Sequence, residues 1–154
     1  MERKDFDGVT ERLRQRAEEE TAPSPQSSAH LRTLYQQIDA IARGDIATVL
    51  EHVTEDVTLE IFAPPEFPFV RLTRGAEPFR RALEHNFAVV EDQRPEVKDL
   101  FVEGEKIVMF GRETGTLRAN GMRYDVEFVE RFTFRNGLLA AVRIIVAHTR
   151  LVAD

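Results

Sequence analysis

The chain has 154 residues, long enough for one domain with a hydrophobic core, and its shares of hydrophobic (42%) and charged (31%) residues are those of a soluble globular protein. Its net charge of −6 comes without a basic cluster, which argues against nucleic acid as the main partner. It contains no cysteine, which excludes disulfides and thiol catalysis. No run approaches the roughly 18 apolar residues of a membrane span, and the N-terminus lacks an apolar signal core. We therefore expect a cytoplasmic protein with no membrane partner.

The first 28 residues are predicted to form an arm outside the main domain. Residues 1–20 are highly charged, and their few apolar side chains recur at helical spacing: Phe6, Val9, Leu13 and Ala17. This narrow stripe favours a peripheral helix that rests on the domain or on a partner subunit, and a regulatory or partner-binding arm is the alternative. Residues 21–28 are rich in Pro and Ser, which is typical of a linker. The domain itself is expected to span residues 29–154.

Three helices and one strand are predicted in the first half of this domain. Apolar residues at helical spacing follow Ser28, a suitable N-cap, and Asp45 can cap a second, short helix. Residues 57–61 alternate between apolar and polar, which indicates a strand. Residues 63–69 contain three prolines, which remove hydrogen-bond donors, so we expect an apolar loop at the rim of a pocket. A third helix is predicted over residues 76–90.

The second half of the domain is predicted to be a meander of four strands. Two strands are expected over residues 97–102 and 106–118, and two more within residues 122–149. A group of helices followed by such a meander indicates the α+β class, with helices packed on one face of a strongly bent antiparallel sheet.

Two registers are possible for the hairpin over residues 122–149. A two-residue Asn136-Gly137 turn pairs Arg135 with Leu138, whereas a three-residue turn with a bulge pairs Phe134 with Leu138. Even-numbered residues are mostly apolar in both strands, so pairing even with even keeps one face apolar. The sequence therefore favours the second register.

The order of these elements and several short motifs together resemble the SnoaL-like, ketosteroid-isomerase-like branch of the NTF2-like superfamily. The resemblance covers residues 29–151 and rests on the segments Arg43–Asp45, Thr54–Val57, Pro68–Phe69, Arg74–Gly75, Glu103–Val108, Gly115–Gly121 and Phe132–Gly137. It implies an NTF2-like (cystatin-like) cone of three helices and a bent sheet around a pocket, and a homodimer formed through the outer sheet face. Members of the family include isomerases, polyketide cyclases, dehydratases and epoxide hydrolases.

The catalytic residues of these relatives do not carry over to this chain. The resemblance places the isomerase Asp base at Ile61 and the isomerase phenol donor at Gln37, with Tyr35 half a turn away. The late acidic residues of cyclase-like members fall at Ile144 and Ala147. The acid, arginine and acid of the epoxide hydrolases fall near Gly115, Glu113 and Ile144, so that triad is also absent.

Two glutamates on the apolar sheet face are the strongest candidates for chemistry. If Leu117 pairs with Tyr124, Glu113 lies opposite Phe128 and diagonal to Glu130, within reach of its side chain. Two carboxyl groups on a concave apolar face repel each other and are poorly hydrated, which raises a pKa and suits a proton shuttle near neutral pH. In the alternative interpretation, structural donors hold one of the glutamates, or one lies at the open rim.

His148 is the third candidate for a catalytic role. The even register places it opposite Tyr124, where the pair could orient or protonate a ligand carbonyl; a rim histidine with a structural partner, or a dimer contact, is the alternative. His30, His52 and His85 fall on solvent-side or end positions of helices and receive no role. No spacing of His, Asp or Glu suggests a metal site, and no cofactor is expected.

The other residues expected around the pocket are apolar or aromatic, which suits a small, largely apolar ligand such as a polyketide, terpenoid or steroid-like molecule. The predicted ligand-binding residues are Tyr35, Ile61, Phe69, Phe87, Met109, Tyr124, Val126, Phe128, Ile144 and Val146. The sequence thus points to a cofactor-independent acid–base isomerase, cyclase or dehydratase. A non-catalytic ligand carrier or sensor, and a dimerisation module, are the alternatives.

Overall fold

A computed structural model of the protein describes residues 2–19 and 25–152, apart from the side chains of residues 148, 149 and 152. Helices and strands follow one another along the chain in the order α1 (Asp7–Glu18), α2 (Pro25–Ala42), α3 (Ile46–Leu50), β1 (Val53–Phe62), β2 (Leu72–Arg74), α4 (Ala76–Ala88), β3 (Val90–Glu103), β4 (Lys106–Leu117), β5 (Arg123–Arg135) and β6 (Leu138–Val152).

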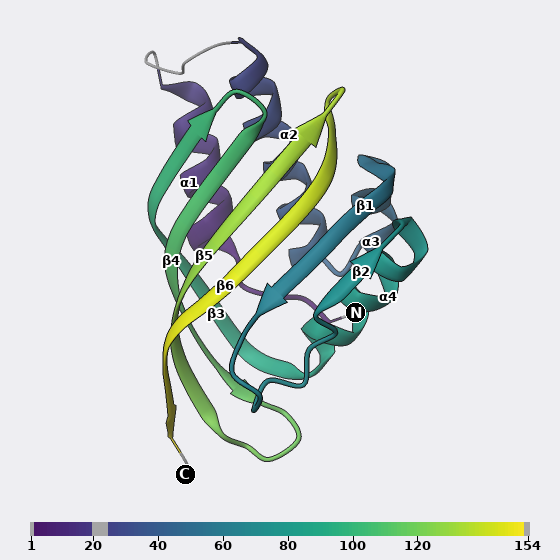
Figure 1. Cartoon of the computed structure of the whole chain (residues 1–154). Helices are drawn as coiled ribbons and strands as arrows, with labels where there is room; N and C mark the ends of the chain where they lie inside the picture. The colour runs from purple at the N-terminus through teal and green to yellow at the C-terminus, as the bar shows by residue number, and fades with distance from the viewer. Residues whose placement is uncertain (1, 20–24, 153–154) are drawn as a thin grey trace.

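The strands form one curled, unclosed sheet in the order β2-β1-β6-β5-β4-β3 (Figure 1). Neighbouring strands are antiparallel except β1 and β6, which run parallel. The helices lie behind the sheet in the view of Figure 1, so one sheet face is covered and the other faces the viewer. The predicted α+β class is therefore confirmed, with one parallel strand pair that the sequence did not indicate.

The helices agree with the prediction except at their ends. Helix α2 begins at Pro25 rather than after Ser28, because proline is favoured in the first turn, where its missing N–H needs no partner. Asp45 caps α3 as predicted: its Oδ1 accepts a hydrogen bond of 3.2 Å from the backbone N–H of Thr48. Helix α4 ends at Ala88, two residues earlier than predicted.

Strand β3 begins well before the predicted start at residue 97. It runs from Val90 and includes Pro95, which pairs with Glu113 of β4. A proline is tolerated here because β3 is an edge strand of the sheet. No further strand pairs with its open side, so the missing N–H of the proline removes no hydrogen bond there. The predicted start of the strand at residue 97 was therefore wrong.

The β5–β6 hairpin combines the two registers considered above. At the turn Arg135 pairs with Leu138, so the predicted Phe134–Leu138 pairing was wrong. A bulge next to the turn then restores even-with-even pairing, as Phe132 with Val142. The side-chain alternation was thus a correct guide to the middle of the hairpin and a poor guide to its turn.

The irregularities of the β5–β6 hairpin together remove the predicted Tyr124–His148 contact. The turn and the bulge next to it have already displaced the pairing, and a further shift between Val126 and Glu127 places Tyr124 opposite Leu151. The prediction that Tyr124 faces His148 was wrong, because a β-bulge inserts one residue and displaces the pairs that follow it.

The β4–β5 pairing is also displaced from the predicted one. Tyr124 pairs with Gly115 rather than with Leu117, because Leu117 already bonds the backbone of Met122 across a tight turn. Glu113 therefore lies opposite Val126, and the prediction that it lies diagonal to Glu130 was wrong. Since Val126 and Glu130 are four residues apart on β5, the two carboxyl-bearing backbones are separated by about 13 Å along the strands.

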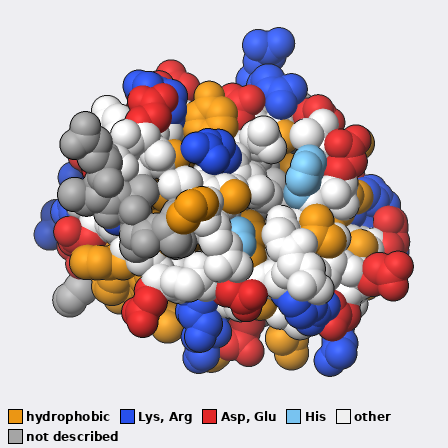
Figure 2. Space-filling model, turned by 90° about the horizontal axis from the view of Figure 1, so that it is seen from above, with side chains coloured by type: hydrophobic (Ala, Val, Ile, Leu, Met, Phe, Trp, Pro, Cys, Tyr) orange, Lys and Arg blue, Asp and Glu red, His pale blue; other side chains and the backbone are white. Residues whose placement is uncertain are grey.

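The surface seen from above carries interspersed acidic and basic side chains (Figure 2). This mixture agrees with the modest net charge of the sequence. No helix within residues 2–19 and 25–152 is long and apolar enough to cross a membrane.

The apolar stripe of the N-terminal arm, defined here as residues 2–19, belongs to the main hydrophobic core. Phe6, Val9 and Leu13 are buried, and Leu13 is fully covered. The arm also crosses from α1 towards α4, where the N-terminus lies (Figure 1). The domain boundary predicted at residue 28 stays a prediction, but the helix before it shares the core of the domain.

Substituting Leu13→Ala is expected to lower the free energy of unfolding by about 2–5 kcal/mol, because it opens a cavity in a closely packed core. Glu11→Ala, on the exposed side of the same helix, should change it by less than about 0.5 kcal/mol. Urea denaturation of both variants measures these values. A small loss for Leu13→Ala would mean that α1 packs only loosely on the domain.

Candidate functional site

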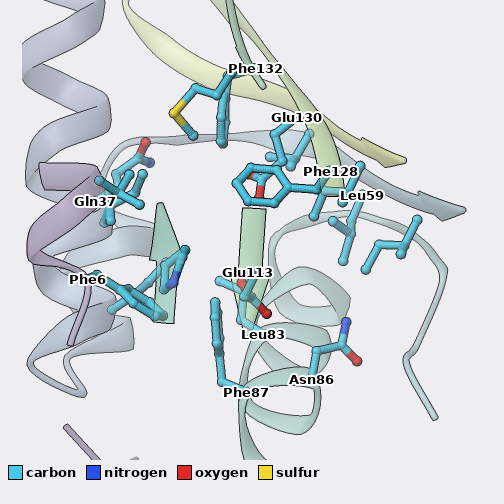
Figure 3. A pocket seen from close by; sticks show the side chains of 18 of the residues that line it. Phe6, Gln37, Leu59, Leu83, Asn86, Phe87, Glu113, Phe128, Glu130 and Phe132 are labelled. Atoms are coloured by element: carbon cyan, nitrogen blue, oxygen red, sulfur yellow. The ribbon is translucent and has the colours of Figure 1, made fainter. Parts of the chain in front are cut away.

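A cavity of about 190 Å³ lies between the covered face of the sheet and the helices. Its walls are mainly apolar, with Glu113 and Glu130 entering from the sheet and Phe6 and Gln37 from the side of α1 and α2 (Figure 3). The predicted ligand-binding residues that line it are Ile61, Phe69, Phe87, Met109, Val126, Phe128, Ile144 and Val146. That these residues contact a ligand stays a prediction.

Two predicted pocket residues are placed elsewhere. Tyr35 packs against the core from a partly buried position and does not line the cavity. Tyr124 also stays outside the lining, although its hydroxyl contacts Glu113, which does line it. Both tyrosines were assigned to the pocket because they lie on an apolar face of a helix or strand. The face alone does not determine where the hydroxyl group of a long side chain lies.

Several lining residues were not predicted from the sequence: Phe6, Val9, Asn86, Gln93 and Pro95. The helical stripe of the N-terminal arm contained the only signal for Phe6 and Val9, and it was interpreted as a peripheral contact. Nothing in the sequence around Gln93 distinguishes it from an ordinary exposed strand residue.

The proline-rich loop over residues 63–69 forms part of the rim, as predicted, and Arg71 holds it in place. The guanidinium of Arg71 donates hydrogen bonds to the carbonyl oxygens of Ala63, Pro64 and Phe67. These carbonyls accept from a side chain because the prolines cannot supply backbone donors. The loop brings Phe69 to the cavity wall.

Helix α4 fixes the other end of this loop. The side-chain amide of Asn86 accepts from Val70 N–H at 2.8 Å and donates to Val70 C=O at 3.0 Å. The Nε2 of His85 lies 2.8 Å from the carbonyl oxygen of Pro68. His85, which had no predicted role, therefore helps to position the rim.

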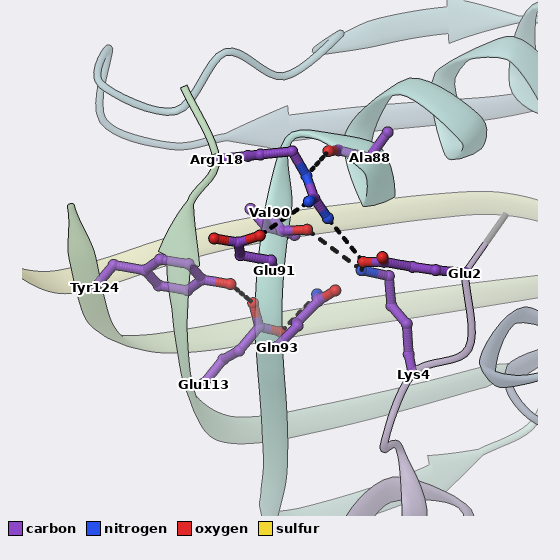
Figure 4. Close-up of polar contacts among 9 residues, drawn as sticks. All are labelled: Glu2, Lys4, Ala88, Val90, Glu91, Gln93, Glu113, Arg118 and Tyr124. Carbon is purple, nitrogen blue, oxygen red and sulfur yellow. Dashed lines mark hydrogen bonds and ion pairs between the residues drawn. The ribbon is translucent and has the colours of Figure 1, made fainter. Parts of the chain in front are cut away.

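Glu113 is held by two hydrogen-bond donors on the neighbouring strands (Figure 4). The Tyr124 hydroxyl donates to its Oε2 at 2.7 Å, and Nε2 of Gln93 donates to its Oε1 at 3.1 Å. Tyr124 can reach it because Gly115 has no side chain: a Cβ there would overlap the phenol hydroxyl. The pairing of β3 with β4 is irregular beside Gln93, and such irregularities re-aim side chains.

Lys4 of the N-terminal arm provides a positive charge near Glu113. Its side chain is almost fully covered, and its ammonium nitrogen lies 3.5 Å from the Val90 carbonyl oxygen and 3.8 Å from a carboxylate oxygen of Glu2. Burial lowers the pKa of Lys4, while the Glu2 carboxylate opposes that shift. Glu2 also forms an ion pair with Arg118 at 2.8 Å, so Arg118 holds the Glu2 carboxylate beside the Lys4 ammonium group (Figure 4).

Glu130 has no hydrogen-bond or ion-pair partner in the part of the chain that the structure describes. It lies opposite Met109 in the sheet and faces the apolar cavity. Burial raises the pKa of Glu130 to about 8, and the negative charge of Glu113 adds to this shift. Glu130 is therefore a neutral carboxylic acid at pH 7.

The two carboxyl groups differ because their surroundings differ. Burial also raises the pKa of Glu113. The hydrogen bonds from Tyr124 and Gln93 and the charge of Lys4 oppose this shift without reversing it. Three groups thus stabilise the ionised form of Glu113, whereas none of the described residues does so for Glu130. Two carboxyl groups with such different surroundings are suited to separate acid and base roles.

Gln37 adds an unpaired acceptor to the cavity wall. Its Nε2 lies 3.4 Å and 3.3 Å from the carbonyl oxygens of Val49 and His52, which requires the nitrogen on that side. Its Oε1 is buried and has no partner among the described residues. A hydroxyl or N–H group of a ligand is a suitable partner for this oxygen.

The histidines contribute little to the site. The side chain of His148, a predicted catalytic residue, lies outside the described part of the chain. His30 is buried inside α2 and stacked on Phe134 with ring centroids 4.6 Å apart, so its predicted place at a solvent-side or end position of a helix was wrong. Among the described residues no group of His, Asp and Glu is arranged to hold a metal ion.

Comparisons with known proteins agree with this architecture. The profile of the SnoaL-like domain matches residues 34–142. No curated protein matches the sequence. Among solved structures, an NTF2-like protein from Burkholderia xenovorans LB400 shares 20% identity over 77% of this chain and 89% of that one, with a TM-score of 0.68.

Two further structures have the same fold. One, from Jannaschia sp. CCS1 and provisionally named a SnoaL-like polyketide cyclase, shares 20% identity over 80% and 88% of the two chains, with a TM-score of 0.65. The other is TerC co-crystallised with polyporic acid, at 20% identity over 77% and 92% of the chains and a TM-score of 0.63. At these identities the likeness shows the fold alone, and it confirms the predicted NTF2-like cone.

The stability of the protein is expected to fall as the pH rises from about 4.5 to about 8. In this range Glu130 is protonated in the folded chain and ionised in the unfolded one, so the folded state binds more protons. The free energy of unfolding should change by roughly 1.4 kcal/mol per pH unit for this group alone. Glu130→Gln should remove that slope, as measured by urea denaturation at a series of pH values.

Glu127→Gln is the matched control, because Glu127 is an exposed carboxyl group next to Val126 on the opposite face of β5. It should leave the pH dependence as in the wild type. An equally steep dependence in Glu130→Gln would contradict the assignment of a neutral Glu130.

Proposed function

Because the chain belongs to the SnoaL-like family and encloses an apolar cavity, we propose that it binds a small apolar molecule there and transfers a proton through Glu130, without a cofactor. The observation that carries this proposal is the unpartnered carboxyl group of Glu130 on the cavity wall, with its pKa raised to about 8. A general acid or base is most effective when its pKa lies near the working pH. Isomerisation, cyclisation and dehydration of a carbonyl-containing molecule all require such a proton transfer.

In this proposal Glu113 and Glu130 have different roles. Glu113, held by Tyr124 and Gln93, does not transfer the proton but raises the pKa of Glu130 through its negative charge. Glu130 gives or takes the proton, since it has no competing partner. Gln37 orients the ligand through its free Oε1.

The names of structural neighbours support the class of reaction and of ligand without identifying either. A SnoaL-like polyketide cyclase acts, by its name, on a carbonyl-rich molecule, and TerC has been crystallised with an organic acid. The acidic positions of the better-known relatives are apolar here: Ile61 and Ile144 both line the cavity. This last observation favours the second candidate function, a carrier that binds the same kind of molecule without converting it.

Ring opening of 1,2-benzisoxazole separates these two functions. This compact apolar probe opens to 2-cyanophenolate when a base removes one C–H proton, which is followed by absorbance. The wild type should accelerate the reaction with a midpoint near pH 8, where Glu130 becomes the free base. Glu130→Gln should lower the rate by ~100-fold, and Glu127→Gln should leave it unchanged.

Glu113→Gln should move the midpoint to lower pH, because it removes the negative charge that raises the pKa of Glu130. If the probe binds, as seen by calorimetry, but opens no faster than in buffer, the protein is a carrier. If the probe neither binds nor reacts, both proposals about the cavity are wrong.

We also propose that the outer sheet face packs against a second copy of the chain, as the resemblance to SnoaL-like proteins implies. A row of apolar residues crosses four neighbouring strands on this face, pairing Phe62 with Ile145, Ile145 with Val129, and Val129 with Phe110. Three of these four side chains are exposed in the single chain, and Val129 is partly buried. Such a contiguous apolar row on an exposed surface is typical of an interface.

Phe110→Asp should convert a dimer into a monomer, because it buries an unpaired charge at one end of the apolar row. Light scattering after gel filtration measures the mass. Val70→Asp, an exposed apolar position on the rim loop, is the control and should keep the dimer. A wild-type mass of one chain at micromolar concentration would contradict this proposal.

A further inference from the structure

We propose that Phe6 and Val9 of the N-terminal arm limit the cavity to apolar molecules of about one ring. The arm lies outside the residues that match the SnoaL-like domain, so this limit is a property of this chain added to the shared shell. The inference rests on the proposed function, because it concerns which molecules the same cavity admits.

Phe6 and Val9 form a wall of the cavity and are buried in the hydrophobic core around it. Both line the cavity, and their exposed fractions are 5% and 4%. The Phe6 ring packs on Phe87 of α4, with ring centroids 5.8 Å apart and the planes tilted by 51° (Figure 3). The aromatic pair thus closes the gap between the arm and α4.

Backbone contacts hold the arm against the domain on both sides of Phe6. The backbone N–H of Lys4 donates to the carbonyl oxygen of Ala42 at 2.8 Å, at the end of α2. Helix α1 approaches β3 so closely that a Cβ on Gly8 would lie 3.0 Å from the carbonyl oxygen of Pro95. The arm is therefore packed as tightly as an internal element, and Phe6 cannot be pushed aside by a ligand at little cost.

The volume decides what fits behind this wall. Apolar cavities of about 150 Å³ accept benzene, whereas sites for drug-sized ligands have roughly 300–1,000 Å³. A cavity of about 190 Å³ therefore takes one ring with a short substituent. A steroid-like molecule, which is among the ligands expected from the sequence, exceeds this volume.

Two phenols that differ by one ring test this limit by titration calorimetry at pH 7. 4-Ethylphenol has one ring and 4-phenylphenol has two, and both present a hydroxyl group to Gln37. The wild type should bind 4-ethylphenol more tightly than 4-phenylphenol, although the larger probe is the more apolar. Phe6→Ala removes one phenyl ring from the wall. Its affinity for 4-phenylphenol should therefore be higher than that of the wild type by about tenfold or more.

A variant that makes the cavity smaller keeps the test valid if Phe6→Ala loosens the arm. Val9→Phe fills the cavity and should weaken binding of 4-ethylphenol by about tenfold or more. Leu13→Ala is the matched control, because Leu13 is buried in the same helix but does not line the cavity. It should leave the ratio of the two affinities unchanged while lowering stability.

The possible results are distinguishable. If the wild type binds neither phenol, the proposed ligand-binding function is wrong and this inference falls with it. If the wild type binds both phenols and Phe6→Ala leaves their affinity ratio unchanged, the cavity binds ligands but the arm does not set their size. A change in ratio for Leu13→Ala equal to that for Phe6→Ala would overturn the assignment to the Phe6 ring itself.

Discussion

Placing charge in an apolar cavity is so costly that it determines how the two carboxyl groups of this site are arranged. Glu113 stays compatible with a negative charge because Tyr124 and Gln93 donate to it and Lys4 lies nearby. Glu130 has none of these partners and remains neutral instead. The apolar lining, the donors and the buried lysine are therefore parts of one arrangement.

Local irregularities of the sheet make this arrangement possible. A regular β3 would continue its alternation through Gln93, whereas the pairing shift beside it accompanies the bond to Glu113. Gly115 leaves the space through which the Tyr124 hydroxyl reaches the same carboxylate. Bulges and strand glycines cost sheet stability, so their position around Glu113 is itself an argument that this carboxyl group matters to the protein.

The sequence predicted the class of fold and many of the wall residues that the sheet contributes, because alternation and helical spacing report burial directly. It did not predict the strand pairings, since one bulge shifts every later pair and leaves the alternation almost unchanged. The Tyr124–His148 contact was lost for this reason, whereas the Glu113–Glu130 diagonal was lost because the β4–β5 turn lies elsewhere than predicted. Glu113 and Glu130 were nevertheless found correctly as cavity carboxyls, because facing the cavity depends on alternation alone.

The arm that the sequence marked as peripheral connects the size of the cavity with its charge. Phe6 forms part of the wall, and Lys4, two residues earlier, lowers the pKa of Glu113 through its positive charge. Displacing the arm would therefore enlarge the cavity and remove the counter-charge in one step. Glu113 would then hold its negative charge less readily, and the repulsion that raises the pKa of Glu130 would weaken with it. Ligand size and proton affinity are thus set by the same short segment, which the shared family domain does not contain.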